Sequence, residues 1–464
     1  MNQTYSLRQK TKQFMAVLLP ILVTQVLQYA MSLFGAMMAG HASAEDLAGV
    51  AIGVNIWMPV YTGLMGILLA VTPLVAHLLG GLRKADIPFV VIQGLYLAAA
   101  IAGVVLLAGF FLLDPLLGAM GLDAAVQGIA RRYLTAIAFG VGPLFIFTVL
   151  RCFIDTLGYT RVTMGLFWVA LPVNTALNYA LIFGKWGFPC LGGAGAGYAT
   201  AITYWCITIA ALVIVLRVRP FCHYGVFDRL HRFSLAAWKE QLSIGVPIGI
   251  AIFCETSIFG VVALFMARFN TATIAAHQAA INFASLLYMI PLSISMALTI
   301  AVGFEAGARR FRDARQYSLL GLGTAVAAAV VFAAGLFLYK DAVAGLYTRD
   351  SDVLELTEAF LLYAACFQLS DAIATPIQGI LRGYKDVTVA FVLAMISYWV
   401  IGLPTGYALA NYSSYGAYGY WIGLIVGLAI GALFLSIRLI RQQRTMAEKA
   451  AAKPGENPCL SADG

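Results

Sequence analysis

Two acidic residues stand inside long uncharged stretches of this sequence and are its strongest candidates for chemistry. Glu255 lies in "IAIFCETSIFGVVALF" (250–265), where no other residue between Glu240 and Arg268 carries a formal charge, and Asp371 lies in "FQLSDAIATPIQG" (367–379). A carboxyl group in apolar surroundings can hold and release a proton near neutral pH. Two carboxylates with hydroxyl and amide oxygens nearby can instead bind a hard cation such as Na⁺. The sequence leaves both ions open.

Polar residues near Asp371 could complete such a cation site. Because residues three and four apart share a helix face, Gln368, Thr375 and Gln378 should lie beside Asp371. From across the bundle we expect His277 and Asn282 as its partners. The His and Cys residues are not clustered at the spacing of metal ligands, so we expect no transition metal site. We also expect no cofactor other than the Na⁺ or H⁺ that the acids would bind.

The first half of the chain differs in its polar residues. Gln28 occupies the place that Glu255 has in the second half, Asn174 and Asn178 are four apart on one helix face, and Asp155 lies near the cytoplasmic end of its helix. The asparagine pair predicts either a transport site or a hydrogen bond between helices. The acidic residues deep inside apolar stretches are therefore concentrated in the second half.

These side chains must be positioned by elements that sit in lipid. The chain has 464 residues, of which 61% are hydrophobic and 11% charged, whereas a soluble domain is nearer a quarter charged. Apolar stretches recur that reach the roughly 20 residues a membrane-spanning helix needs. They predict an all-α integral membrane protein with twelve spans, near 14–38, 47–79, 91–113, 128–150, 162–184, 194–216, 241–267, 274–302, 318–339, 354–381, 387–410 and 414–437.

The basic residues set the orientation of these spans. Most of the 29 Lys and Arg residues fall in segments on the same side as the N-terminus, so both termini should be cytoplasmic. Lys and Arg are nearly absent from the apolar stretches themselves. The net charge of +8 forms no patch interleaved with aromatic residues, so we expect a lipid bilayer as partner and no nucleic acid.

The two halves of the chain repeat each other. Aligning Pro20 with Pro247 also aligns Gly80 with Gly307 and Arg83 with Arg310. Since each repeat holds six spans, the halves should be two bundles related by a pseudo-two-fold axis along the membrane normal, with alternating access between them. The predicted segments are a lobe at 1–216, a cytoplasmic linker at 217–241 with a short helix from Ser234 to Gln241, a second lobe at 242–440 and a disordered cytoplasmic tail at 441–464.

Several long motifs, in order along nearly the whole chain, carry a family resemblance. They include "MAGHASAEDLAGVAIG" (38–53), "PVNTALNYALIFGKWGFPC" (172–190), "FCETSIFGVVAL" (253–264) and "AAHQAAINFASLLYMIPLSIS" (275–295). The chain resembles the multidrug and toxic compound extrusion (MATE) transporters of the NorM type. The resemblance implies an antiporter of the bacterial cytoplasmic membrane that exports amphipathic, often cationic drugs in exchange for Na⁺ or H⁺.

The resemblance also assigns residues, with two departures. It places the family's cation-site acids on Glu255 and Asp371, and its N-lobe polar site on Asp155, Asn174 and Asn178. The family's first helix has an aspartate in a stretch like "DTVMAG", but this chain reads "GAMMAG", with Gly35 at that position. A tyrosine common in the tenth helix is Phe367 here, which removes one oxygen ligand.

The drug cavity should be lined by apolar and aromatic groups, which suit bulky cations. Candidates are Tyr288, Met289, Phe367 and Tyr398. Alternatives are a lipid-linked precursor flippase of the same superfamily, which would want a more cationic cavity, and a membrane-embedded prenyl-transfer enzyme, which would need clustered aspartates. A major-facilitator transporter and a passive channel fit the sequence less well. A monomer suffices for alternating access.

Overall fold

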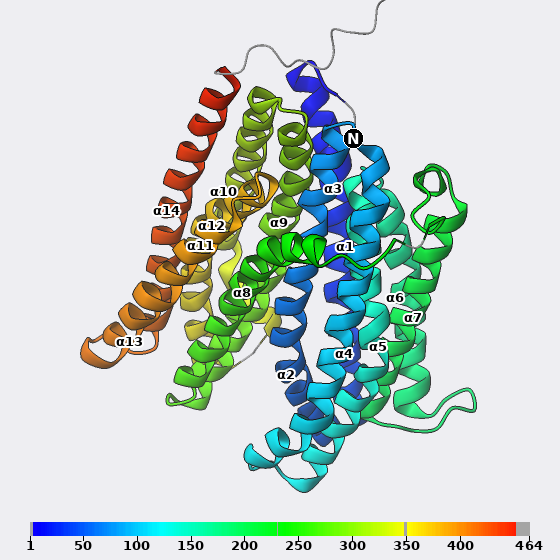
Figure 1. Ribbon diagram of the computed structural model, residues 1–464. Helices are drawn as coiled ribbons and strands as arrows, with labels where there is room; N and C mark the ends of the chain where they lie inside the picture. Colours follow the sequence, from blue (N-terminus) through cyan, green and yellow to red (C-terminus); the bar gives the residue numbers. More distant parts are fainter. Residues whose placement is uncertain (1–2, 230, 348–349, 452–464) are drawn as a thin grey trace, which may run out of the picture. The chain divides into compact units, whose positions relative to one another are not determined.

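The computed structural model describes residues 3–229, 231–347 and 350–451, and these residues are almost entirely helical. Within them, twelve helical segments are long and apolar enough to cross a membrane, which confirms the predicted number of spans. A helix satisfies its own backbone hydrogen bonds, as lipid demands. The helices (Figure 1) are α1 (Leu7–Ala42), α2 (Ala44–Leu68), α3 (Val71–Gly80), α4 (Ile87–Ala119), α5 (Ala124–Thr156), α6 (Thr160–Phe183), α7 (Gly193–Arg217), α8 (Leu235–Met266), α9 (Thr271–Gly307), α10 (Phe311–Tyr347), α11 (Ser351–Gly383), α12 (Val387–Met395), α13 (Leu403–Tyr412) and α14 (Tyr418–Ala451).

Three of the described spans are interrupted, and α10 is one of them, with a kink at Tyr339. The second span consists of α2 and α3, which are separated at Leu69 and Ala70. The eleventh consists of α12, a π-helical segment at Ile396–Gly402 and α13. Pro404, which has no N–H to donate, is the second residue of α13, and α13 follows directly on the π-helical segment. Short π-helical segments within α-helices often occur at functional positions.

The described residues form two compact units, and the chain passes between them several times. The N-unit comprises Met15–Val75 and Arg83–Phe259. In it, α5 packs against α2, α4 and α7, and α6 packs against α7. The start of α8 packs closely on α2, because Gly66 and Gly249 leave no room for a side chain: a Cβ on Gly66 would lie 2.7 Å from the Gly249 Cα. Small residues at such crossings let membrane helices approach.

The C-unit comprises the described residues up to Phe14, Ala76–Leu82, and the described residues from Gly260 on. Its centre is α11, which packs against α9, α10 and α14, while α13 packs along α14. The C-unit therefore includes the first turns of α1 and the second half of α3, although both precede the predicted linker. The two compact units therefore do not coincide with the two sequence repeats, which meet at the predicted linker 217–241.

Two predicted boundaries need correction. Helix α14 continues to Ala451, so a disordered tail beginning at residue 441 is wrong for residues 441–451. The reason is that "RQQRTMAEKAA" consists almost wholly of strong helix formers. The rest of the predicted tail, 452–464, lies outside the described residues. The short helix predicted from Ser234 to Gln241 is the start of α8, which begins at Leu235 and runs without a break into the seventh span.

Candidate functional site

Asp371 lies on α11 with 1% of its surface exposed. The Thr375 hydroxyl, one turn later, donates a hydrogen bond of 2.7 Å to its Oδ1 atom. Gln368 and Gln378 are buried on the same helix. The Gln368 side-chain oxygen has no hydrogen-bond donor among the described residues. The predicted polar face therefore exists, and it offers carboxylate, hydroxyl and amide oxygens to a cation.

The expected partners of Asp371 on α9 have other contacts. His277 is buried, and its ring lies edge-on to the rings of Trp421, at 5.7 Å, and Phe360, at 6.3 Å. Asn282 is exposed, and its side-chain oxygen accepts a hydrogen bond of 3.4 Å from Gln278. The surroundings of His277 are those of a packing histidine. A role for either residue at Asp371 stays a prediction.

Glu255 is half-buried on α8 and belongs to the N-unit, whereas Asp371 belongs to the C-unit. Each acid is therefore described by itself, and a common site stays a prediction. The neighbouring Thr256 hydroxyl donates to the Ile252 carbonyl, at 2.9 Å, as serine and threonine often do within membrane helices.

The two asparagines of α6 form a neutral hydrogen-bonded chain inside the N-unit. Asn178 donates to the side-chain oxygen of Asn174, at 2.9 Å, and Asn174 donates to the Thr203 hydroxyl on α7, at 3.1 Å. The Asn178 side-chain oxygen has no donor among the described residues. A Cβ added to Gly35 of α1 would have Asn178 as its one neighbour within 4 Å, with Nδ2 at 3.8 Å. The position where the family has an aspartate thus faces an asparagine amide.

Asp155 is the acid of an ion pair with Arg151, one turn earlier on α5. The Arg151 Nε lies 3.3 Å from the Asp155 Oδ2, and the two side chains are 11% and 10% exposed. The Thr163 hydroxyl donates to the other carboxylate oxygen, at 2.6 Å. The pair as a whole therefore carries no net charge, and a role for Asp155 in binding a coupling ion stays a prediction.

Arg151 also contacts the glutamine that the sequence aligned with Glu255. Its Nη1 donates to the Gln28 side-chain oxygen, at 3.2 Å, and its Nη2 donates to that of Gln25, at 3.0 Å. The guanidinium group lies over the Phe167 ring, 5.8 Å from its centroid. The predicted fourth span ends at residue 150, whereas the helix that contains it continues to Thr156 and so includes Arg151. The counter-ion of this arginine, Asp155, lies on the next turn of the same helix.

A comparison with known proteins supplies the family. The MatE family model matches residues 20–180 and 247–408, which correspond to the two predicted repeats. The chain belongs to the MatE family. It is 56% identical, over 97% of this chain and 98% of the relative, to a probable multidrug resistance protein NorM of Halalkalibacterium halodurans. It is 54% identical, over 97% of this chain and 99% of the relative, to a probable multidrug resistance protein NorM of Bacillus subtilis.

Solved structures support the MatE fold. The crystal structure of a Vibrio cholerae MATE transporter, VcmN, has a TM-score of 0.86 at 18% identity, covering 95% of this chain and 98% of that one. The crystal structure of the eukaryotic MATE transporter AtDTX14 has a TM-score of 0.85 at 20% identity, covering 96% and 99%. This MatE chain is thus a NorM-type, multi-pass membrane protein, as the motifs predicted.

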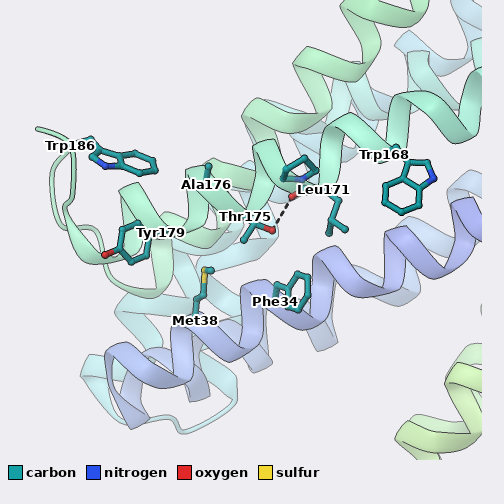
Figure 2. A pocket seen from close by; sticks show the side chains of 9 residues that line it. Phe34, Met38, Trp168, Leu171, Thr175, Ala176, Tyr179 and Trp186 are labelled. Atoms are coloured by element: carbon teal, nitrogen blue, oxygen red, sulfur yellow. Dashed lines mark hydrogen bonds between the residues drawn. The ribbon is translucent and has the colours of Figure 1, made fainter.

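A groove of about 670 Å³ lies within the N-unit of this MatE protein, between α1 and α6 (Figure 2). Phe34 and Met38 of α1 face the α6 residues across it, and Trp186 of the following loop lies at one end. The polar side-chain groups of its lining are the hydroxyls of Thr175 and Tyr179 and the indole N–H groups of Trp168 and Trp186. The Thr175 hydroxyl donates a hydrogen bond to the Leu171 carbonyl, at 2.9 Å. The further lining residues are Trp168, Leu171, Pro172 and Ala176. Such a surface suits flat apolar groups.

The four residues predicted to line a drug cavity lie elsewhere, in the C-unit. Tyr288 and Met289 are half-buried on α9, whereas Phe367 on α11 and Tyr398 in the π-helical segment are buried. None of the four lines the groove between α1 and α6. Sequence reasoning missed this groove, since the aromatic residues of α6 recur at a helical spacing that is also common in ordinary lipid-facing surfaces.

Proposed function

We propose that this protein is a multidrug efflux antiporter, which exports amphipathic, often cationic compounds in exchange for Na⁺ or H⁺. It is a transporter rather than an enzyme, since the family and the named relatives are transporters. The relatives are named multidrug resistance proteins, and the present chain covers nearly their whole length. Their substrates are therefore the best guide to the chemistry of this chain.

The observation that carries the coupling part of the proposal is the burial of Asp371 within a span. Asp371 is 1% exposed and accepts a hydrogen bond from the Thr375 hydroxyl, and the amides of Gln368 and Gln378 are buried on the same helix. In the N-unit, by comparison, Asp155 pairs with Arg151, and the polar chain from Asn178 through Asn174 to Thr203 is uncharged. Because an acid deep in a span is costly and usually marks an ion path, we assign the coupling ion to Asp371.

Glu255 is the second coupling residue in this proposal. It is the one formally charged residue between Glu240 and Arg268, and it occupies the middle of a span. The coupling ion binds when the acids are ionised and is displaced as drug binds. Both Na⁺ and H⁺ are compatible with carboxylate and hydroxyl oxygens, and neither requires a cofactor.

Drug binding is proposed to rest on aromatic and apolar surfaces with few charges. Phe34, Trp168 and Tyr179 in the α1–α6 groove can stack on aromatic rings and attract cations to their faces. The four C-unit candidates offer similar groups. The proposed location is the bacterial cytoplasmic membrane, with both termini inside because basic residues concentrate on that side. The proposed state is a monomer, because one chain with two lobes suffices for alternating access.

Arg151 bears on the alternative of a lipid-linked precursor flippase. A flippase would use cationic groups to bind pyrophosphate, and Arg151 is a cation within a span. Its Nε is paired with Asp155, and Nη1 and Nη2 donate to glutamine oxygens. Since its donors are engaged in this way, the arginine adds no net charge for a pyrophosphate, and the drug antiporter is the better proposal.

Inverted membrane vesicles test the function directly. Ethidium accumulation in the vesicles is followed while either a Na⁺ gradient or a pH gradient is imposed separately. Accumulation under one of the two gradients, lost in Asp371→Asn vesicles that hold the same amount of protein, would support the antiporter. Accumulation that requires neither gradient, or that survives in Asp371→Asn, would reject the coupling proposal.

A further inference from the structure

Four segments meet at one end of the C-unit: the first turns of α1, the end of α3, the end of α9 and the start of α10. The loops at this end are rich in Lys and Arg, so the positive-inside rule places them on the cytoplasmic side. The α1 and α3 segments come from the first sequence repeat, and the α9 and α10 segments from the second. Their contacts therefore join the two repeats on that side.

A buried lysine holds α1 to α10. The Lys10 Nζ lies 2.8 Å from the Asp313 carboxylate, and the two side chains are 3% and 27% exposed. The same ammonium group donates to the Thr4 carbonyl, at 3.5 Å, and the Thr4 and Tyr317 hydroxyls are 3.2 Å apart. A lysine this deeply buried depends on its carboxylate partner.

An arginine extends this contact to α9. The Arg310 Nε lies 2.6 Å from the buried Glu305 and 4.0 Å from Asp313. Its guanidinium group also lies over the Phe304 ring, 5.4 Å from the centroid. Asp313 thus lies between a cation from the first repeat and a cation from the second.

Helices α3 and α9 approach closely beside these charges. A Cβ on Gly307 would lie 2.5 Å from the His77 Cα, and one on Gly303 would lie 2.9 Å from the Ala76 Cβ. The His77 Nε2 is 2.7 Å from the Gly383 carbonyl oxygen. The glycines therefore let the two helices touch along their backbones.

The repeat-related contact in the N-unit includes neutral hydrogen bonds. There the start of α8 packs on α4, where Gln241 donates to the Val90 carbonyl, at 2.9 Å, and Trp238 donates to the Gln93 carbonyl, at 3.2 Å. The counterpart of Arg310 and Asp313 is the pair Arg83 and Asp86, whose side chains are 71% and 48% exposed. The C-unit contact thus includes buried charges, whereas the counterpart of Arg310 and Asp313 in the N-unit is exposed.

We propose that Lys10, Asp313, Arg310 and Glu305 form a cytoplasmic latch, which holds α1 and α3 against α9 and α10 and must part once in every transport cycle. Lys10 and Asp313 are positioning residues, since they act through the helices and contact no substrate. The proposal rests on the alternating access of the proposed function, because only a transporter that opens to the cytoplasm needs to break these contacts.

Reversible cross-linking tests whether the latch parts. Cysteines replace Ala76 and Gly303 in a chain whose seven natural cysteines are changed to alanine. Their Cβ atoms would lie 2.9 Å apart, which is about 0.6 Å less than the shortest separation usual in disulfides, so the two helices must move slightly apart to accept the bond. If the latch parts, oxidation abolishes ethidium efflux and a reductant restores it, whereas neither single-cysteine chain responds. Efflux that continues in the cross-linked protein would overturn the latch. Absence of gradient-driven efflux in the unmodified chain would instead reject the proposed function.

Charge variants test the latch without a disulfide, in case the cysteine pair does not fold. Asp313→Asn leaves the buried ammonium without its counter-ion and should lower efflux by about tenfold. Adding Lys10→Met should restore efflux to within about threefold of the unmodified chain, because the neutral pair removes the uncompensated charge. Asp86→Asn is the matched control at the exposed counterpart and should leave efflux unchanged. A double variant worse than Asp313→Asn, or an equal loss in the control, would contradict the latch.

Discussion

The Thr375 hydroxyl donates a 2.7 Å hydrogen bond to the Asp371 carboxylate, one turn away on α11. This bond fixes the orientation of an acid that lies 1% exposed within a span. A hydroxyl that orients a carboxylate can also turn its oxygen toward a bound cation. The two residues therefore make a matched pair of tests for the proposed coupling site.

Asp371→Asn should abolish gradient-driven drug transport, since the amide has nearly the shape of the acid but cannot bind or release the ion as a carboxylate does. Thr375→Ala should weaken transport by about tenfold, the effect of roughly 1.4 kcal/mol from one lost hydrogen bond to a charged group. Ethidium accumulation in vesicles with matched protein levels measures both. An Asp371→Asn protein that transports at the unmodified rate would show that the acid is structural.

Glu255→Gln should likewise abolish coupled transport while helix packing and membrane insertion persist. If both acids serve one coupling step, the double variant with Asp371→Asn should be little worse than either single variant. The measurement is the initial rate of accumulation under each gradient. Losses that multiply in the double variant would indicate that the two acids act independently.

The buried pair of α5 predicts a different pattern. Arg151→Met leaves the acid of the pair without its cation, which should destabilise the protein by about 3–5 kcal/mol, whereas adding Asp155→Asn should recover much of that loss. Thermal unfolding in detergent measures these changes. Should Asp155→Asn alone abolish coupling in a stable protein, Asp155 would be an ion ligand after all.

The sequence predicted the fold well because lipid leaves few choices. Apolar stretches of sufficient length must be helices, and their number, the repeats and the polar face around Asp371 all follow from residue types. Long-range pairing was harder to predict. Arg151 directly follows the predicted span 128–150, and its neutralisation by Asp155 and its contacts with two α1 glutamines depend on packing that no local pattern encodes.

The groove between α1 and α6 predicts a change in drug affinity. Trp168→Ala and Tyr179→Ala should each raise the KM for ethidium about threefold, with little change in maximal rate, because each aromatic face contributes about 0.5–1 kcal/mol to a cation. Tyr412→Ala is a control on an exposed tyrosine remote in sequence from the groove. Equal effects in all three variants would show that the groove does not bind the drug.

Gly35→Asp tests whether the first helix can regain a coupling charge. The space exists, since Asn178 is the one neighbour within 4 Å of a Cβ at this position, and its Nδ2 could donate to the new carboxylate. An ionised acid within a span costs at least about 2.5–3.5 kcal/mol, so the new group should take up a proton readily. We therefore expect drug transport to gain dependence on the pH gradient. Gly35→Asn, which has nearly the same shape without the charge, should show no such gain. Identical pH profiles for the aspartate and asparagine variants would mean that the polar chain of α6 takes no part in coupling, even when it is given an acid.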